Sequence, residues 1–429
     1  MDLGWLLGHA KTTFHHHAAP LHLRTKAGSS TDLLKICEAA TPPCRLNPLL
    51  FNGHLQSLWT TVTPQDIPIY YKRHVFSASD PAYAGTFAVD FVVPPYGDTD
   101  ASLPPRTTHF TDKEFDGIGS LDTKPMLITL HGLSGGSYEI YLRHVLVLLG
   151  KANWEACVVN SRGCANSVIT SPILFNARAT WDVRQVVKWL KKTFPNRPLF
   201  AIGYSLGANI LTNYLGEEGG DCVLKAAVVV SNPWNLETGN QFLQRSWIGR
   251  EVYSSTLGTH VKKLFDDHFE ELSKIPQIDV EKVRKIKYLH EFDRYVQGPT
   301  WGYPTENAYY RDASSSDSLL AVKIPLFAIN AEDDPIAAKE AIPFGEFKQN
   351  PYTVLCTTSV GGHLGWFETA GGRWFAKPAT QFLMKMAEGI DRPAEDRGDG
   401  RISPKNAEVA ANRPDYNPMR RKLQMHIEP

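Results

Sequence analysis

The chain has 429 residues, of which 42% are hydrophobic and 21% are charged, as expected for a folded protein with a large core. Lysine plus arginine and aspartate plus glutamate both total 45 residues, so the formal net charge is zero. This balance excludes an overall positive field that would attract nucleic acid, and we expect no nucleic-acid partner. The sequence contains no apolar run of the roughly eighteen residues that a membrane-spanning helix needs.

The cysteine pattern indicates free thiols rather than a disulfide framework or a metal site. The six cysteines are scattered and include no Cys-x-x-Cys pair: Cys37, Cys44, Cys157, Cys164, Cys222 and Cys356. Such usage is typical of a reducing compartment. We therefore expect a cytoplasmic protein without a metal ion or cofactor.

In chain order, residues 1–39 are predicted to form an N-terminal extension that precedes the main domain. Residues 70–76 and 85–95 then alternate apolar and polar side chains, which predicts an antiparallel hairpin at the edge of a sheet. The segment 96–124 is rich in proline, aspartate and threonine and is predicted to be a loop.

From residue 125 onward, short and almost continuously apolar runs alternate with helix-like segments. This pattern predicts an α/β fold with a mostly parallel central sheet that is covered by helices on both faces. The predicted strands are PMLITL (125–130), EACVVN (155–160), RPLFAIG (197–203), LKAAVVVS (224–231), KIPLFAIN (323–330) and YTVLCTT (352–358).

Two further segments complete the domain organisation. About ninety residues separate the strands at 224–231 and 323–330, and their pattern is mostly helical. An insertion of this size is typical of a lid over an active site, so residues 236–322 are predicted to form a helical lid within a domain that spans 40–389. The charged, aromatic-poor segment 390–429 is predicted to be a disordered tail.

The motif Gly-x-Ser-x-Gly occurs twice, around Ser205 and around Ser134. This motif marks the nucleophile of many hydrolases when a strand precedes the serine and a helix follows it. Both serines follow a predicted strand, so the local context alone does not choose between them.

Chain order favours Ser205. In hydrolases with this motif the acid follows the second strand after the nucleophile's strand, and a histidine comes later. Asp333 and Asp334 end the strand at 323–330, which is two strands after Ser205, and His363 follows the next strand. We prefer Asp334 as the acid because it stands directly before a proline, and we expect Asp333 to shape the turn.

The loop around Ser134 then has a different predicted role. It occupies the place that supplies one backbone donor of an oxyanion hole. The N–H groups of Leu206 and Leu133 are predicted to stabilise the tetrahedral oxyanion, each lowering the barrier by about 3 kcal/mol. His363 would accept the proton of Ser205 while Asp334 orients the imidazole.

Several segments together resemble the type 4 α/β-hydrolase family, over about residues 40–385. They are RLNPLLFNGHLQSLW (45–59), HGLSGGS (131–137), NSRGCANS (160–167), TWDVRQVVKWL (180–190), GYSLGAN (203–209), NPWNL (232–236), NAEDDPI (330–336) and GGHLGW (361–366). The family includes bacterial YheT-type esterases, animal membrane-associated phospholipases and lipases, and fungal medium-chain fatty-acid ethyl ester synthase/esterases. The resemblance implies an α/β-hydrolase fold, and it places the same triad on Ser205, Asp334 and His363.

The resemblance also implies activity on medium-chain acyl esters. When water attacks an acyl-Ser205 intermediate, the protein acts as an esterase. When an alcohol attacks it, the protein acts as an acyltransferase, and acyl-CoA is then an alternative acyl donor. Other readings are acylation or deacylation of a specialised metabolite in a biosynthetic pathway, and a non-catalytic binding protein with a hydrolase fold. Peripheral contact with a membrane or lipid droplet is a further expectation.

Three other features have structural explanations that we favour. Arg162 is expected to form a structural salt bridge, with Asp182 or another acid, rather than to contact a substrate carboxylate or phosphate. His54 is expected to tie the N-terminal segment to the core. The tryptophans Trp234, Trp301 and Trp366 are expected to belong to the core rather than to an acyl pocket.

Overall fold

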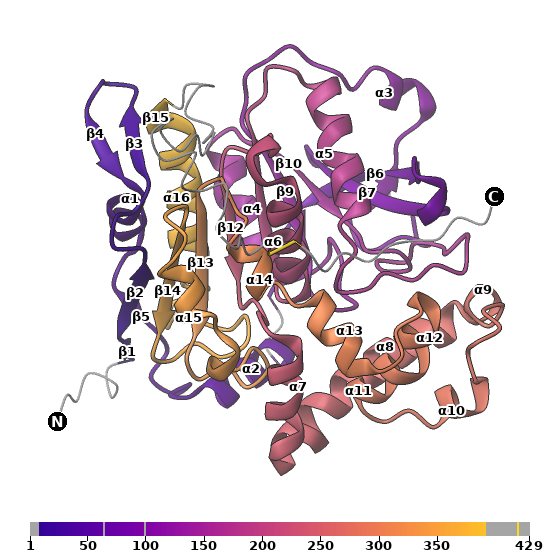
Figure 1. The fold of residues 1–429 in the computed structure, drawn as a ribbon. Helices are drawn as coiled ribbons and strands as arrows, with labels where there is room; N and C mark the ends of the chain where they lie inside the picture. The colour runs from indigo at the N-terminus through magenta and orange to yellow at the C-terminus, as the bar shows by residue number, and fades with distance from the viewer. Residues whose placement is uncertain (1–7, 63–64, 98–99, 392–417, 420–429) are drawn as a thin grey trace, which may run out of the picture.

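A ten-stranded sheet forms the centre of the described part of the chain, which a computed structural model covers at residues 8–62, 65–97, 100–391 and 418–419. The strand order is β2-β14-β13-β12-β11-β9-β10-β7-β6-β8 (Figure 1). In chain order the strands are β2 (Thr12–His16), β6 (Tyr70–Ser77), β7 (Thr86–Val93), β8 (Thr107–His109), β9 (Met126–Leu130), β10 (Glu155–Val159), β11 (Leu199–Tyr204), β12 (Ala227–Val230), β13 (Leu326–Ala331) and β14 (Thr353–Thr358). The six strands from β14 to β10 run parallel, as the continuous apolar runs predicted.

Helices cover both faces of this sheet. Successive strand residues point to opposite sides and are apolar, so each face packs against helices. Leu127 packs in a core with α1 (Leu33–Ala40), α4 (Ile140–Lys151) and α16 (Ala376–Gly389), whereas its neighbour Ile128 packs in a second core. The second core includes side chains from α5 (Trp181–Thr193), α6 (Leu206–Glu218), α14 (Ser316–Leu319) and α15 (Phe344–Phe347). The predicted α/β class is therefore confirmed.

An antiparallel pairing joins the parallel strands to further strands on each side of the sheet. β6 and β7 form the predicted hairpin, and β7 pairs with β10. The segment predicted to be a loop contains the short strand β8, which pairs with β6, and α3 (Asp112–Asp116). At the other edge β2, from the predicted N-terminal extension, pairs with β14.

Small elements complete the N-terminal region. One small sheet pairs β1 (His9–Ala10) with β5 (Cys44–Arg45), and another pairs β3 (His22–Thr25) with β4 (Ser30–Asp32) and β15 (Ile390–Asp391). Helix α2 (Gly53–Val62) follows β5. The predicted tail lies almost entirely outside the described residues.

The segment between β12 and β13 is helical throughout much of its length. Its helices are α7 (Leu236–Arg245), α8 (Ser255–Asp267), α9 (Phe269–Leu272), α10 (Val280–Arg284), α11 (Leu289–Phe292), α12 (Gly298–Trp301), α13 (Glu306–Ala313) and α14, which packs against the sheet. Two π-helical turns, η4 (Gly249–Ser254) and η5 (Asp293–Gln297), lie within it. Figure 1 shows α7 to α13 grouped on one side of the sheet. Side chains from α8 to η5 share a small apolar core with the loop between β10 and α5, which contributes Ile169 and Phe175.

Short 3₁₀ turns occur at η2 (Pro81–Tyr83), η3 (Gly219–Asp221) and η6 (Lys339–Ala341). All six cysteines are buried and none forms a disulfide bond, as their spacing indicated. Among the described helices none is long and apolar enough to cross a membrane.

Candidate active site

Ser205 occupies a sharp turn between β11 and α6. Its φ of 50° lies in the left-handed region, where a non-glycine residue is strained. The flanking glycines permit this turn: a Cβ on Gly203 would lie 2.5 Å from the Gly207 oxygen, and a Cβ on Gly207 would lie 2.4 Å from the His131 oxygen. Any larger side chain at either glycine would push the helix off the sheet.

The structure brings the three predicted triad residues together. His363 Nε2 lies 2.9 Å from Ser205 Oγ, and His363 Nδ1 lies 2.9 Å from Asp334 Oδ2. A neutral imidazole with its proton on Nδ1 satisfies both contacts, because it donates to the carboxylate and accepts from the serine hydroxyl. Each residue follows a different parallel strand, β11, β13 or β14, at the same edge of the sheet.

The two adjacent aspartates form different sets of hydrogen bonds. Asp334 Oδ1 accepts hydrogen bonds from the backbone N–H groups of Ile336 and Ala337, both at 2.8 Å, which hold the carboxylate toward the imidazole. Asp333 Oδ1 instead accepts from the N–H groups of Gly361 and Gly362, at 2.9 and 3.0 Å. Burial raises the pKa of Asp333 to about 6. Asp333 thus fastens the loop that carries the histidine.

Two hydroxyls also hold the histidine loop, and the sequence provided no specific signal for either. Ser57 from α2 accepts a hydrogen bond from the His363 N–H at 2.8 Å and donates to the Gly53 oxygen. Ser231, directly after β12, accepts from the Leu364 N–H at 3.2 Å. Helix α2 therefore belongs to the support of the site, although it lies about 300 residues away in sequence.

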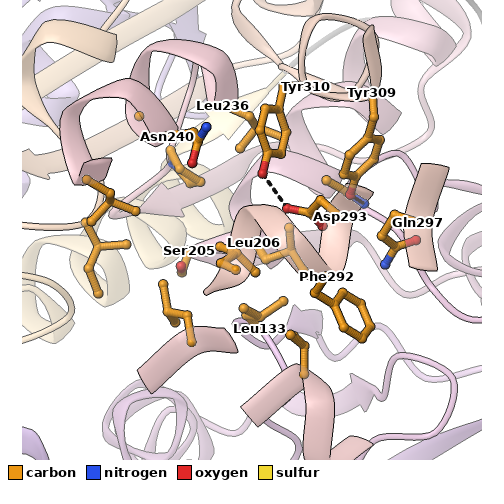
Figure 2. A pocket seen from close by; sticks show the side chains of 18 of the residues that line it. Leu133, Ser205, Leu206, Leu236, Asn240, Phe292, Asp293, Gln297, Tyr309 and Tyr310 are labelled. Atoms are coloured by element: carbon orange, nitrogen blue, oxygen red, sulfur yellow. Dashed lines mark hydrogen bonds between the residues drawn. The ribbon is translucent and has the colours of Figure 1, made fainter. Parts of the chain in front are cut away.

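The loop after β9 places Leu133 beside Ser205, where both line the same cavity together with Leu206 (Figure 2). Ser134 has no contact with a histidine among the described residues, and its hydroxyl donates to the Leu133 oxygen at 2.8 Å. The Tyr141 hydroxyl accepts a hydrogen bond from the Gly132 N–H at 2.8 Å and anchors this loop. The loop is thus held in place beside Ser205.

His131 also fastens this loop. Its Nε2 accepts a hydrogen bond from the Ser161 N–H at 3.0 Å, which leaves Nδ1 to donate to the Gly132 oxygen at 2.6 Å. Burial lowers the pKa of His131 to about 4, so the ring is neutral at pH 7. A neutral ring is the form that these two contacts require.

The cavity beside Ser205 is mostly apolar. Its aliphatic and aromatic lining comes mostly from the β9 loop, α6, the helical segment and the loop after β13, and includes Leu133, Leu206, Leu236, Leu243, Val261, Leu289, Phe292 and Ile336. The polar side chains that line it are Asn240, Asp293, Gln297, Tyr309 and Tyr310 (Figure 2). Such a lining suits a hydrocarbon chain with a small number of polar contacts.

Arginine, histidine and tryptophan side chains that the sequence singled out have structural contacts. Arg162 forms a buried salt bridge with Asp182, at 2.8 Å. The three tryptophans Trp234, Trp301 and Trp366 are buried and do not line the cavity. His54 stacks on Tyr253 of η4, and its Nδ1 lies 2.8 Å from the tyrosine hydroxyl, so it ties α2 to the helical segment.

Comparisons with known proteins agree with the fold. The model of the alpha/beta hydrolase fold family matches residues 125–363. A monoacylglycerol lipase of Saccharomyces cerevisiae is 37% identical over 357 residues, covering 78% of this chain and 79% of its own. The medium-chain fatty acid ethyl ester synthase/esterase 2 of the same yeast is 29% identical, covering 80% and 86%. Esterase Pf2001 of Pyrococcus furiosus is a structural neighbour with 18% identity and a TM-score of 0.42, covering 70% and 86%. The chain belongs to the alpha/beta hydrolase fold family.

Proposed function

We propose that the protein is a serine hydrolase that cleaves carboxylic esters or thioesters through an acyl intermediate on Ser205. The observation that carries this proposal is the unbroken series of hydrogen bonds from Ser205 through His363 to Asp334, with Ser205 in the lining of a mostly apolar cavity. A protein that only bound ligands would not need a serine held in a strained turn against a histidine.

In the proposed mechanism, Ser205 Oγ attacks the ester carbonyl while His363 Nε2 takes its proton. Asp334 stabilises the imidazolium that forms. The N–H groups of Leu206 and Leu133 donate to the oxyanion, and His363 then passes the proton to the leaving alkoxide. Water, or another alcohol, attacks the acyl-serine in the second half of the reaction.

The substrate is proposed to be an ester with a medium-length acyl chain. The apolar lining of the cavity supports this, and so do the activities in the names of the two yeast relatives, a monoacylglycerol lipase and an ethyl ester synthase/esterase. Hydrolysis is the primary proposal. Transfer of the acyl group to an alcohol, from an ester or from acyl-CoA, uses the same residues and is the second candidate.

The surroundings are proposed to be a reducing compartment, which is supported by six buried cysteines that form no disulfide bond. Exposed apolar side chains beside the site support contact with a lipid surface. Those on and before α2 are Leu49, Phe51, Leu58, Trp59 and Val62, and those between α7 and η4 are Trp247 and Ile248. We call these seven residues the α2–η4 surface.

Labelling with a fluorophosphonate probe tests the proposed nucleophile. Ser205→Ala is expected to abolish labelling, whereas Ser134→Ala keeps it, because the Ser134 hydroxyl has no histidine to activate it. Labelling that survives Ser205→Ala would contradict the proposal. A series of p-nitrophenyl esters, with and without ethanol, then separates hydrolysis from transfer by the products that form.

A further inference from the structure

Asp293 is the one carboxyl group among the described residues that line the mostly apolar cavity. It begins η5, and 6% of its surface is exposed. Tyr310 donates a hydrogen bond to Oδ2 at 2.6 Å, as Figure 2 shows. Within the described part of the chain, no protein donor reaches Oδ1. Burial raises the pKa of Asp293 to about 7.

A carboxyl group in this position is poorly matched to a plain hydrocarbon ligand. An alkyl chain in the cavity would remove water from Oδ1 and offer no hydrogen bond in return. Fixing the Tyr310 hydroxyl requires only one carboxyl oxygen, so a purely structural role leaves Oδ1 unexplained. Asp293 also lies among Leu206, Leu236 and Phe292 in Figure 2, with no cation to neutralise it among the described residues that line the cavity.

A hydroxyl group is the ligand chemistry that fits this carboxyl best. With a pKa near 7, Asp293 populates both protonation states at neutral pH. A hydroxyl donates to the ionised form and accepts from the protonated form, whereas an ammonium suits only the first. The amide of Asn240, which also lines the cavity, is a second polar group available to such a substrate.

We propose that Asp293 is a specificity-determining residue, which selects esters carrying a hydroxyl group at a distance from the reacting carbonyl. This inference rests on the proposed function of Ser205. The hydroxyl belongs either to the acyl chain or to the alcohol part of the ester. Both sources present the same chemistry to the carboxyl, and the experiment distinguishes them.

Binding is measured by calorimetry on the full chain with Ser205→Ala, which prevents turnover. Three probes are compared: ethyl octanoate, ethyl 8-hydroxyoctanoate and 1-octanoylglycerol. At least one hydroxylated probe is expected to bind about tenfold more tightly than ethyl octanoate, since a site built for a hydroxyl disfavours the analogue that lacks it. The probe that shows this preference identifies the source of the hydroxyl.

The preference is expected to fall below twofold when Asp293→Leu is added. Asp293→Asn keeps an acceptor for Tyr310 and is expected to reduce the preference for the hydroxylated probe at least threefold. This second variant tests the role of Asp293 if the leucine variant does not fold. Asp266→Leu, which removes an exposed carboxylate from α8 in the same helical segment, should leave the preference unchanged. Equal binding of all three probes, no binding of any, or a preference that survives both Asp293 variants overturns the inference.

The proposal for Ser205 and the proposal for Asp293 can be tested separately. Fluorophosphonate labelling of the protein with Ser205 present reports on the nucleophile alone. Labelling without a hydroxyl preference overturns the role of Asp293 and leaves the hydrolase proposal standing. A hydroxyl preference without labelling overturns the hydrolase proposal instead.

Discussion

Asp333 and Asp334 are neighbours in sequence, yet their carboxyl groups contact different partners. Asp334 contacts the imidazole of His363, and Asp333 contacts two backbone N–H groups of the histidine loop. An amide oxygen can replace a carboxylate as an acceptor from backbone N–H groups. It cannot stabilise an imidazolium in the same way. The two positions therefore respond differently to the same substitution.

Asp334→Asn is expected to lower kcat by roughly a thousandfold or more, as removal of the orienting carboxylate does in serine triads. Asp333→Asn is expected to keep kcat within about threefold, because the amide oxygen still accepts from Gly361 and Gly362. Turnover of p-nitrophenyl octanoate measures both. Thermal melting verifies that each variant folds, and similar losses in both variants would argue against Asp334 as the acid.

At the scale of elements, α2 packs directly against the loop that follows β13. A Cβ added to Gly53 would lie 1.9 Å from the Asp333 oxygen, which is backbone and cannot move aside without shifting the loop. Gly53→Ala is therefore expected to reduce both the free energy of unfolding, by about 1–3 kcal/mol, and the rate of ester hydrolysis.

Gly150→Ala is the matched control for Gly53→Ala. Gly150 is also helical, but a Cβ there meets no atom within 4 Å, so alanine should be neutral or stabilise by about 0.5 kcal/mol. Urea unfolding and p-nitrophenyl ester turnover of the two variants give the comparison. A wild-type stability and rate for Gly53→Ala would show that α2 does not constrain the loop.

His131, in the loop after β9, should make the free energy of unfolding depend on pH. His131 stays neutral in the folded protein down to about pH 4, whereas an unfolded histidine takes up a proton below about pH 6.5. The unfolded state therefore binds more protons in this window, and the free energy of unfolding falls as the pH falls from 6.5 toward 4. The contribution of His131 to this fall is at most about 3 kcal/mol.

His131→Gln is expected to remove that contribution, so its melting temperature should depend less steeply on pH between 7 and 5 than that of the wild type. His260→Gln, at an exposed position, should keep the wild-type slope. Melting curves at several pH values test this. Parallel slopes for all three proteins would mean that His131 does not govern the acid sensitivity.

The sequence predicted the parallel strands, and it predicted that Ser205, Asp334 and His363 follow three of them, because both features depend on local patterns. Apolar runs of strand length identify β9 to β14, and the triad residues follow three of those strands directly. The sequence did not predict the roles of Ser57 and β2, because these roles depend on contacts with distant parts of the chain. Their partners, the histidine loop and β14, lie more than 300 residues away, and neither a lone serine nor a histidine-rich strand reveals such a partner. The role of Asp293 depends on side chains from α13, which only the tertiary structure brings to it.

At the scale of the whole molecule, the α2–η4 surface lies beside the proposed active site. Trp247 is 70% exposed and follows α7, whose side chains line the cavity. Trp59 is 39% exposed and belongs to α2, which supports the histidine loop. Large exposed apolar side chains gathered in one region are typical of a surface that contacts a lipid or protein partner. Here the position beside an apolar cavity favours lipid.

Replacing both Trp59 and Trp247 by serine is expected to reduce the fraction of protein that sediments with phosphatidylcholine vesicles several-fold, since less apolar area reaches the lipid. The ratio of turnover on vesicle-borne ester to turnover of a dispersed short-chain ester should fall with it. Leu121→Ser is the control, because Leu121 is 76% exposed but precedes β9, at the opposite end of the parallel strands from Ser205. If vesicle binding is equal in all three proteins, the α2–η4 surface does not contact lipid. If it falls in the Leu121 variant as well, the binding reflects apolar exposure in general, and access to the cavity from a membrane must be sought on another face.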